Sequence, residues 1–172
     1  SPESLLANLE KLDRVAREIH NTWYEGTKKR ISEARAGGDE TEARKLESKP
    51  TFKAWENLAE EQKDDNRTAA DHIEVKIRTV GFDPDQPDLR EKWENLSAEE
   101  LDRLSRMEHE RWMAPLWLRN WESGERNDEA RVHDNLVAYD QLNEGTQKYD
   151  TEQVTMAAKY LEAKHSQPEA GL

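Results

Sequence analysis

Residues 12–23, LDRVAREIHNTW, and residues 101–112, LDRLSRMEHERW, carry the same residue types at the same spacing. Six of the twelve positions are identical, and they include a histidine and a tryptophan, of which the whole chain has only five and six. Chance is a poor explanation for this match, and self-similarity along a chain is the signature of duplicated structural units. The sequence therefore predicts two copies of one helical motif.

The second half of each copy matches more loosely. The corresponding pairs are Trp55 and Tyr139, Leu58 and Leu142, Asn66 and Asp150, Ile73 and Ala157, and Ile77 and Leu161. Each copy is then a helical hairpin: a long helix, an irregular excursion and a shorter return helix, at whose start Asn66 or Asp150 is expected as the cap. Neither copy has enough apolar surface to be stable alone. We therefore expect repeat one, 5–82, and repeat two, 89–165, to pack about a pseudo-twofold axis as a single domain over 1–172.

The first long helix is expected over 2–36. Ser1 can cap it, Pro2 suits the first helical position, and Gly37 with Gly38 ends it. Its apolar residues follow steps of three and four, which trace one stripe on a helix. The stripe consists of Leu5, Leu9, Leu12, Ala16, Ile19 and Trp23.

Capping residues and apolar spacing place the remaining helices. They are expected over 41–46 after Asp39, over 67–80, from Ser97 onward with Pro115 bending or shortening the helix, and over 150–164. Ser97 and Glu100 form a capping box. Residues 82–88 read as a linker, 124–135 as a loop and 166–172 as a frayed tail. With no strand of more than a few residues, the expected fold is all-α, with irregular loops between helices.

Composition narrows the possible environments. The net charge is −12, and the basic residues are interleaved with acidic ones, so a nucleic acid polymer is a poor partner. The chain has no cysteine, no apolar run near the length of a membrane helix and no signal-peptide pattern. We expect a cytoplasmic protein without a membrane partner. The start at Ser1, without a methionine, fits a fragment whose partners include other domains of a longer chain.

The repeats resemble the ryanodine receptor repeat, in its bacterial or phage type with two tandem copies. This module occurs in pairs in animal calcium-release channels, and singly or paired in bacterial and phage proteins. The resemblance covers 5–165. In the second copy it rests on residues 107–112 (MEHERW), Trp121, Gly124, residues 126–128 (RND), Arg131, His133 and residues 136–142 (LVAYDQL). In the first copy it rests on residues 65–67 (DNR), 70–73 (ADHI), Lys76 and Gly81.

This resemblance implies a function. In the family, a pair of repeats can hold an adenine nucleotide between the copies, and several bacterial members look like sensors of nucleotide-derived signals. By this analogy Trp23 and Trp112 would stack on the base, Arg126 would contact phosphate, and Asn66 and Asp150 would lie nearby. The expected ligand is a nucleotide or a nucleotide-like small molecule.

Each candidate residue also has a structural interpretation. Trp23 and Trp112 lie on apolar stripes and can be core residues rather than two walls of a slot. His20 and His109 are expected to bond backbone carbonyl groups more readily than a ligand. Arg126 and Arg131 either form solvated ion pairs with Glu125, Asp128 or Glu129, or bind phosphate.

Catalysis finds little support in the sequence. There is no cysteine, no serine in a nucleophile-elbow pattern and no phosphate loop. Glu108-His109-Glu110 lacks a second histidine at the helical spacing of a zinc site. We therefore expect no enzyme, no metal and no cofactor, but a sensor domain that binds its ligand between the two repeats. The alternatives are a protein–protein interaction module and, less favoured, a nucleotide hydrolase.

Overall fold

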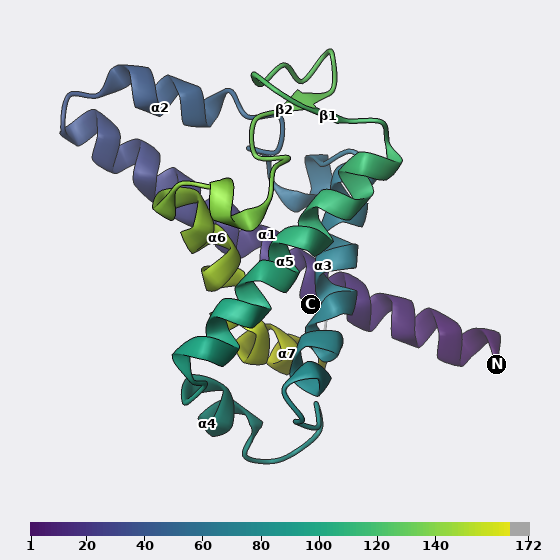
Figure 1. Cartoon of the computed structure of the whole chain (residues 1–172). Coiled ribbons are helices and arrows are strands. Elements are labelled where there is room, and N and C mark those ends of the chain that lie inside the picture. Colours follow the sequence, from purple (N-terminus) through teal and green to yellow (C-terminus); the bar gives the residue numbers. More distant parts are fainter. Residues whose placement is uncertain (166–172) are drawn as a thin grey trace. The chain divides into compact units, whose positions relative to one another are not determined.

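The computed structural model describes residues 1–165, except for the side chains of Leu9, Lys164 and His165. The tail 166–172, expected to fray, lies outside the described residues. The described chain is helical apart from one minimal strand pair, which confirms the all-α prediction (Figure 1). Its elements in order are α1 (Pro2–Ala36), α2 (Glu40–Glu47), the 3-10 helix η1 (Trp55–Asn57), α3 (Glu60–Thr79), α4 (Leu89–Glu94), α5 (Ala98–Leu118), β1 (Glu122–Ser123), β2 (Val132–His133), the 3-10 helix η2 (Tyr139–Gln141), α6 (Glu144–Thr155) and α7 (Ala157–His165).

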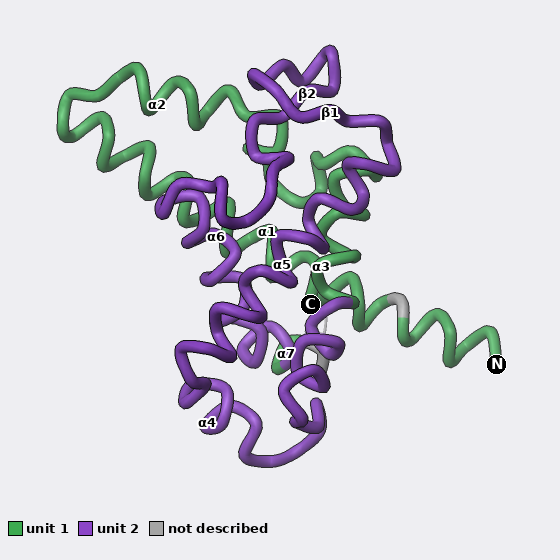
Figure 2. The backbone as a smooth tube through the Cα atoms, in the orientation of Figure 1, with its two compact units in different colours: residues 1–71, 162–172 green, residues 72–161 purple. Residues whose placement is uncertain are grey.

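The chain divides into two compact units (Figure 2). Unit 1 contains Ser1–Asp71 together with the chain from Glu162 onward, and unit 2 contains His72–Leu161. The continuous helix α3 therefore begins in unit 1 and ends in unit 2. Each unit holds the long helix and the 3-10 helix of one predicted copy: α1 and η1 in unit 1, α5 and η2 in unit 2. The single-domain packing about a pseudo-twofold axis stays a prediction.

In unit 1, helix α1 has the predicted bounds because both of its ends are specified locally. The Ser1 side chain accepts the Ser4 N–H, and Gly37 caps the other end. The middle of the stripe is buried, at Ala16 and Ile19, whereas its first residue, Leu5, is 63% exposed. Apolar periodicity defines a face but does not supply a partner for it.

The later part of α1 packs against α2, which begins after its predicted cap. The Asp39 carboxylate accepts the Glu42 N–H at 3.0 Å. A small apolar cluster joins the two helices and consists of Ile31, Ala43 and Leu46, with Ala34 and Phe52 packed against it.

Helix α3 begins at Glu60 rather than at residue 67. No buried apolar residue precedes Ala69 on this helix, so its first turns carry no apolar signal. The Gln62 side chain instead accepts the Ala59 N–H at 2.9 Å at the start of the helix. Asn66 is therefore inside the helix and bonds the Gln62 carbonyl oxygen at 3.0 Å, which corrects its assignment as a cap.

In unit 2, helix α5 starts with the predicted capping box between Ser97 and Glu100. The helix continues through Pro115 to Leu118, so the proline does not end it. Directly after the expected linker, the structure adds the short helix α4, which buries Leu89 and Trp93. It also adds the parallel strands β1, just ahead of the expected loop, and β2, inside it.

The return helix of unit 2 also begins earlier than expected. Asn143 is the N-cap of α6 and its side chain accepts the Thr146 N–H at 2.8 Å. Asp150 is thus inside α6 and buried, and the prediction that it caps this helix is wrong. Gly145 in the first turn conceals the helix from pattern reading, because glycine usually marks a turn. No helix in the described part of the chain is long and apolar enough to cross a membrane.

Candidate functional site

A histidine contact ties α1 to the segment ahead of η1 in unit 1. His20 is buried, and its Nε2 lies 2.7 Å from the carbonyl oxygen of Lys53. A carbonyl oxygen only accepts hydrogen bonds, so this nitrogen carries the proton and donates it. The imidazole lies 5.9 Å from the Trp23 ring and 6.3 Å from the Trp55 ring between centroids. We call such a contact an anchor, and this one anchor 1.

Anchor 2 has the same construction in unit 2. Buried His109 has its Nε2 2.7 Å from the carbonyl oxygen of Val137, and its ring lies 5.7 Å from Trp112 and 6.2 Å from Tyr139. The Trp112 and His109 rings are stacked at 21°. Lys53 and Val137 each stand two residues ahead of the first residue of their 3-10 helix. Both histidines therefore take the structural role expected for them.

An arginine one turn before each histidine completes the anchor. In both units its guanidinium pairs with the second residue of the 3-10 helix and lies over the ring of the first. The contacts are Arg17 to Glu56 at 2.7 Å and to the Trp55 ring at 5.8 Å, and Arg106 to Asp140 at 2.8 Å and to the Tyr139 ring at 4.9 Å. The residues that recur in the sequence are thus the ones that build the same local structure twice.

The two anchors differ at one position on the helix that follows the 3-10 helix of each unit. In unit 1 this position is Asn66, whose amide bonds within its own helix. In unit 2 it is Asp150, whose Oδ2 lies 3.5 Å from Nδ1 of His109. Burial, and then the negative charge of Glu108, raise the pKa of Asp150 to about 7, although Arg111 and Lys76 oppose the shift.

Beside this pair, Glu108 is buried in an ionic cluster, whereas the equivalent residue of the first copy is the apolar Ile19. Its carboxylate pairs with Lys76 and with Arg111, whose Nη2 is 2.7 Å from Oε1. Burial favours a raised pKa for Glu108, but the charges and hydrogen bonds of Arg111 and Lys76 outweigh it and hold the pKa below its usual range. Burial also lowers the pKa of Lys76, against the attraction of Glu108.

Sequence reasoning missed Lys76, Glu108 and Arg111 as members of this cluster. One signal was available, because Glu108 takes the place that Ile19 has on the stripe of the first copy. A charged residue at a buried stripe position needs a buried partner.

Trp112 is half-buried and stacks on His109. His133, at the end of β2, meets it edge-on with ring centroids 5.0 Å apart and planes at 78°. The Nδ1 of His133 accepts the Asn135 N–H at 3.0 Å, and Trp121 lies 6.2 Å from the same imidazole. Trp112 therefore has two ring neighbours that fix its orientation.

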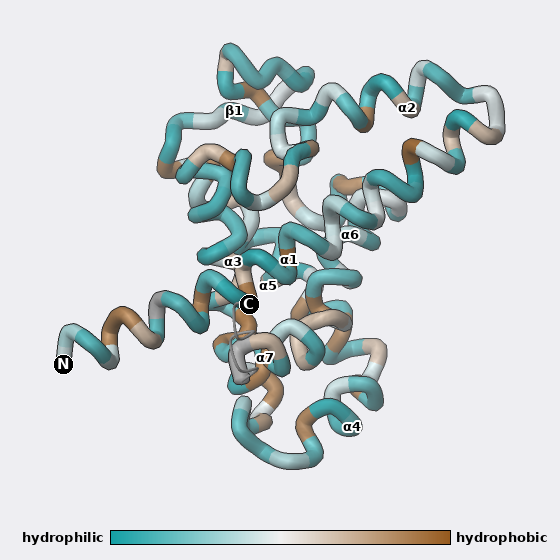
Figure 3. The backbone as a smooth tube through the Cα atoms, turned by 180° about the vertical axis from the view of Figure 1, so that it is seen from behind, coloured by the Kyte–Doolittle hydropathy of each residue, from teal (hydrophilic) through white to brown (hydrophobic). Residues whose placement is uncertain are grey.

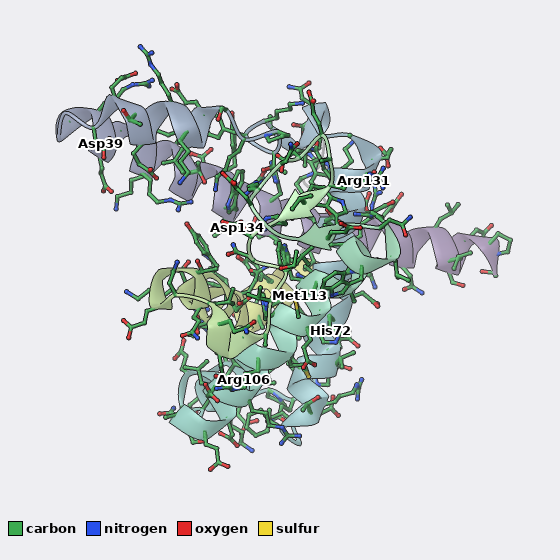
Figure 4. All side chains as sticks on the ribbon, turned by 45° about the horizontal axis from the view of Figure 1, so that its top comes forward. Asp39, His72, Arg106, Met113, Arg131 and Asp134 are labelled. Carbon is green, nitrogen blue, oxygen red and sulfur yellow. The ribbon has the colours of Figure 1, made fainter. Side chains whose placement is uncertain are left out.

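The two loop arginines are exposed; Arg126 bonds within the loop, and Arg131 bonds the end of α5. Arg126 donates from Nε to Asp128 at 3.1 Å, and Arg131 donates from Nη1 to the Arg119 carbonyl oxygen at 2.6 Å. Arg131 has a left-handed backbone with φ 55°, which this bond helps to hold. Figure 4 shows Arg131 and Asp134 on the loop beyond α5, with Met113 and Arg106 along that helix.

The structure groups the predicted site residues in two sets. His109, Trp112 and Asp150 form one cluster in unit 2, while His20 and Trp23 are neighbours in unit 1. Asn66 bonds within its own helix, Arg126 bonds within the loop, and Arg131 bonds the end of α5. Among the side chains that the structure describes, no group of three or more His, Asp or Glu is placed to hold a metal ion.

Comparisons with protein families, with curated proteins and with solved structures find no match. The function is therefore inferred from the residues and contacts of the two units.

Proposed function

We propose that this protein binds a nucleotide or a nucleotide-derived small molecule and acts as the sensory part of a larger system. The observation that carries the proposal is the state of Trp112. Its indole is half-buried, is stacked on His109 and is met edge-on by His133. An oriented and partly exposed indole is a stacking surface for a base, and such a contact contributes about 1–3 kcal/mol.

Arg126 and Arg131 supply the cationic component of the proposal. Each uses one N–H of its guanidinium for the hydrogen bond described above, and a guanidinium has five donors. Both lie in the loop that follows the helix carrying Trp112. Guanidinium groups bind phosphate oxygens through paired hydrogen bonds, so these residues are the proposed phosphate contacts.

His109 and Asp150 take a positioning role in this proposal. Their side chains are only 3% and 12% exposed, and they face each other. Enclosed groups of this kind hold the indole in place more readily than they reach a ligand. The enclosure of the pair also gives a hydrolase no exposed acid or base at this position.

A fluorescence titration tests the proposed site. Cyclic and linear nucleotides should quench tryptophan emission, and Trp112→Ala should weaken binding about ten-fold or more, as expected for a lost stacking contact. Trp117→Ala is the matched control, because Trp117 lies on the same helix and is 47% exposed. Equal losses in the two variants, or no binding by the wild type across the nucleotide panel, would overturn the proposal.

The interaction module is the second candidate function, and one observation favours it. Leu5 and Leu6 on the first turns of α1 are 63% and 61% exposed. Figure 3 shows a hydrophobic stretch of this helix near the N-terminus. Replacing both with aspartate should abolish self-association or capture of a protein partner if this face is an interface. The same change should leave nucleotide binding unaffected, which separates the two candidate functions.

A further inference from the structure

We propose that His109 and Asp150 share a single proton, and that its loss at alkaline pH weakens ligand binding at Trp112. The second half of this inference rests on the proposed nucleotide function, whereas the first half concerns the unliganded protein. Within this pair, Asp150 has no titratable counterpart in the first copy, where Asn66 takes its place.

The protonation of the imidazole is fixed on one side. Nε2 of His109 donates to the Val137 carbonyl oxygen at 2.7 Å, so a neutral ring has its lone pair on Nδ1. That nitrogen lies 3.5 Å from Oδ2 of Asp150. Turning the ring over to avoid the carboxylate would break the bond to Val137, so the ring cannot escape without loss.

One proton makes this contact attractive, and no proton makes it repulsive. With the proton on Asp150, the carboxyl group can donate to Nδ1; with the proton on His109, the imidazolium faces a carboxylate. Without the proton, a carboxylate oxygen faces a nitrogen lone pair in an enclosed site, which costs free energy because neither group is solvated.

The neighbouring charges set where the proton is lost. From α5, Glu108 faces Asp150 and disfavours its ionisation, while Arg111 favours it; from α3, Lys76 also favours it. Tyr139 of η2 lies edge-on to the His109 ring. The balance places the pKa of Asp150 at about 7, so the proton is exchanged close to neutral pH.

The consequence reaches the proposed ligand through ring contacts. The His109 ring is stacked on the indole of Trp112, and that indole is the proposed base-binding surface. Movement of the imidazole away from a deprotonated Asp150 shifts the support of the indole. Anchor 1 offers an internal reference, because Asn66 at the equivalent position does not titrate.

The first experiment uses the whole chain without ligand. Tryptophan near-ultraviolet circular dichroism and the ¹⁵N resonances of His109 are followed from about pH 5.5 to about pH 9, the range around neutral in which a group of this kind exchanges its proton. The wild type should show a transition near neutral pH that is absent from Asp150→Asn, and Asn66→Gln should keep it. Far-ultraviolet circular dichroism confirms that each variant is folded. A transition that persists unchanged in Asp150→Asn would overturn the shared proton.

The second experiment measures the affinity for cyclic AMP over the same range. A phosphodiester is the chosen probe because phosphate monoesters themselves titrate near neutral pH. The affinity of the wild type should fall about five-fold or more above the transition, the size of a weakened stacking contact. The affinity of Asp150→Asn should not change with pH.

The outcomes of the two experiments are separable. A pH-independent affinity in a wild type that binds cyclic AMP and shows the transition would overturn the regulation. If no nucleotide of the panel binds, the proposed function is overturned. The first experiment would still decide whether His109 and Asp150 share a proton.

Discussion

The two copies of the motif share their anchors but not their buried charges. Where the first copy has Ile19 and Asn66, the second has Glu108 and Asp150. In both, the histidine bonds a backbone carbonyl at the same distance and the arginine pairs with the 3-10 helix. The recurring residues therefore form the shared local structure, and the residues that differ, together with Lys76 of α3, give unit 2 its titratable interior.

The largest effect is expected when Glu108 alone is replaced by the isoleucine that the first copy has at this position. Glu108→Ile should lower the free energy of unfolding by about 3–5 kcal/mol, because it leaves Lys76 and Arg111 buried without their carboxylate. Urea denaturation monitored by circular dichroism measures the loss. A loss below about 1 kcal/mol, the scale of an exposed ion pair, would show that the cluster is solvated in solution.

A triple variant separates the loss of one buried charge from the loss of the whole cluster. Lys76→Met, Glu108→Ile and Arg111→Thr together remove all three charges, and threonine is the residue that the first copy has at the position of Arg111. Because apolar replacement of an entire buried ionic group is often neutral or stabilising, the triple variant should recover most of the stability lost in Glu108→Ile. A triple variant less stable than the single one would mean that the charges stabilise the fold.

The anchors should be of comparable importance to each other. His20→Leu and His109→Leu each leave a part-buried carbonyl oxygen without its donor, and each should cost about 1–3 kcal/mol. His109→Leu should cost more at acidic pH than at alkaline pH, because only His109 also faces Asp150. Denaturation of both variants at two pH values measures this difference; a pH-dependent cost in His20→Leu alone would reverse the assignment.

The pH dependence of stability should come from the second copy. The pKa of Asp150 is raised in the folded protein from 3.8 to about 7, so the folded state binds more protons than the unfolded state between these values. Its stabilising contribution is therefore complete at low pH and is lost as pH rises through about 7. Asp150→Asn should be more stable than the wild type at pH 8, by an amount on the order of 1–2 kcal/mol after solvent screening. A wild-type stability that rises over this range relative to the variant would contradict the sign.

The smallest effect is expected at the exposed arginine pairs. Arg17→Ala and Arg106→Ala should each cost about 0–1 kcal/mol, because exposed ion pairs contribute little. Arg106 should cost slightly more, since it also pairs with Asp102 and lies closer to its ring. Thermal denaturation of the two variants measures this order, and a larger loss of stability in Arg17→Ala would contradict it.

The sequence predicted those parts of the fold that local chemistry determines. The bounds of α1 and the start of α5 follow from capping residues that contact their own helix. The starts of α3 and α6 could not be found from apolar periodicity, because their first turns are polar. Apolar periodicity therefore places Asn66 and Asp150 at the caps of these helices. The prediction that the two residues correspond still agrees with the structure, since each stands six residues after the first residue of its helix.

The candidate site was predictable only in part. The two histidines and their tryptophans recur at the same spacing, so the sequence alone indicates that each histidine is a neighbour of its tryptophan. The ion pair between Lys76 and Glu108 joins residues on different helices, and no spacing along the chain specifies that contact. The packing of the two copies about an axis, and a ligand held between Trp23 and Trp112, stay predictions.

A thermal-shift screen of the wild type beside Trp112→Ala decides whether the Trp112 indole is a nucleotide-binding surface. Linear and cyclic nucleotides and dinucleotide derivatives are the probes, and a ligand at 100 times its dissociation constant stabilises the protein by about 2.7 kcal/mol. We expect at least one nucleotide to raise the melting temperature of the wild type, and Trp112→Ala to lose most of this shift. Equal shifts in both proteins, or none in the wild type, would show that the indole is not such a surface.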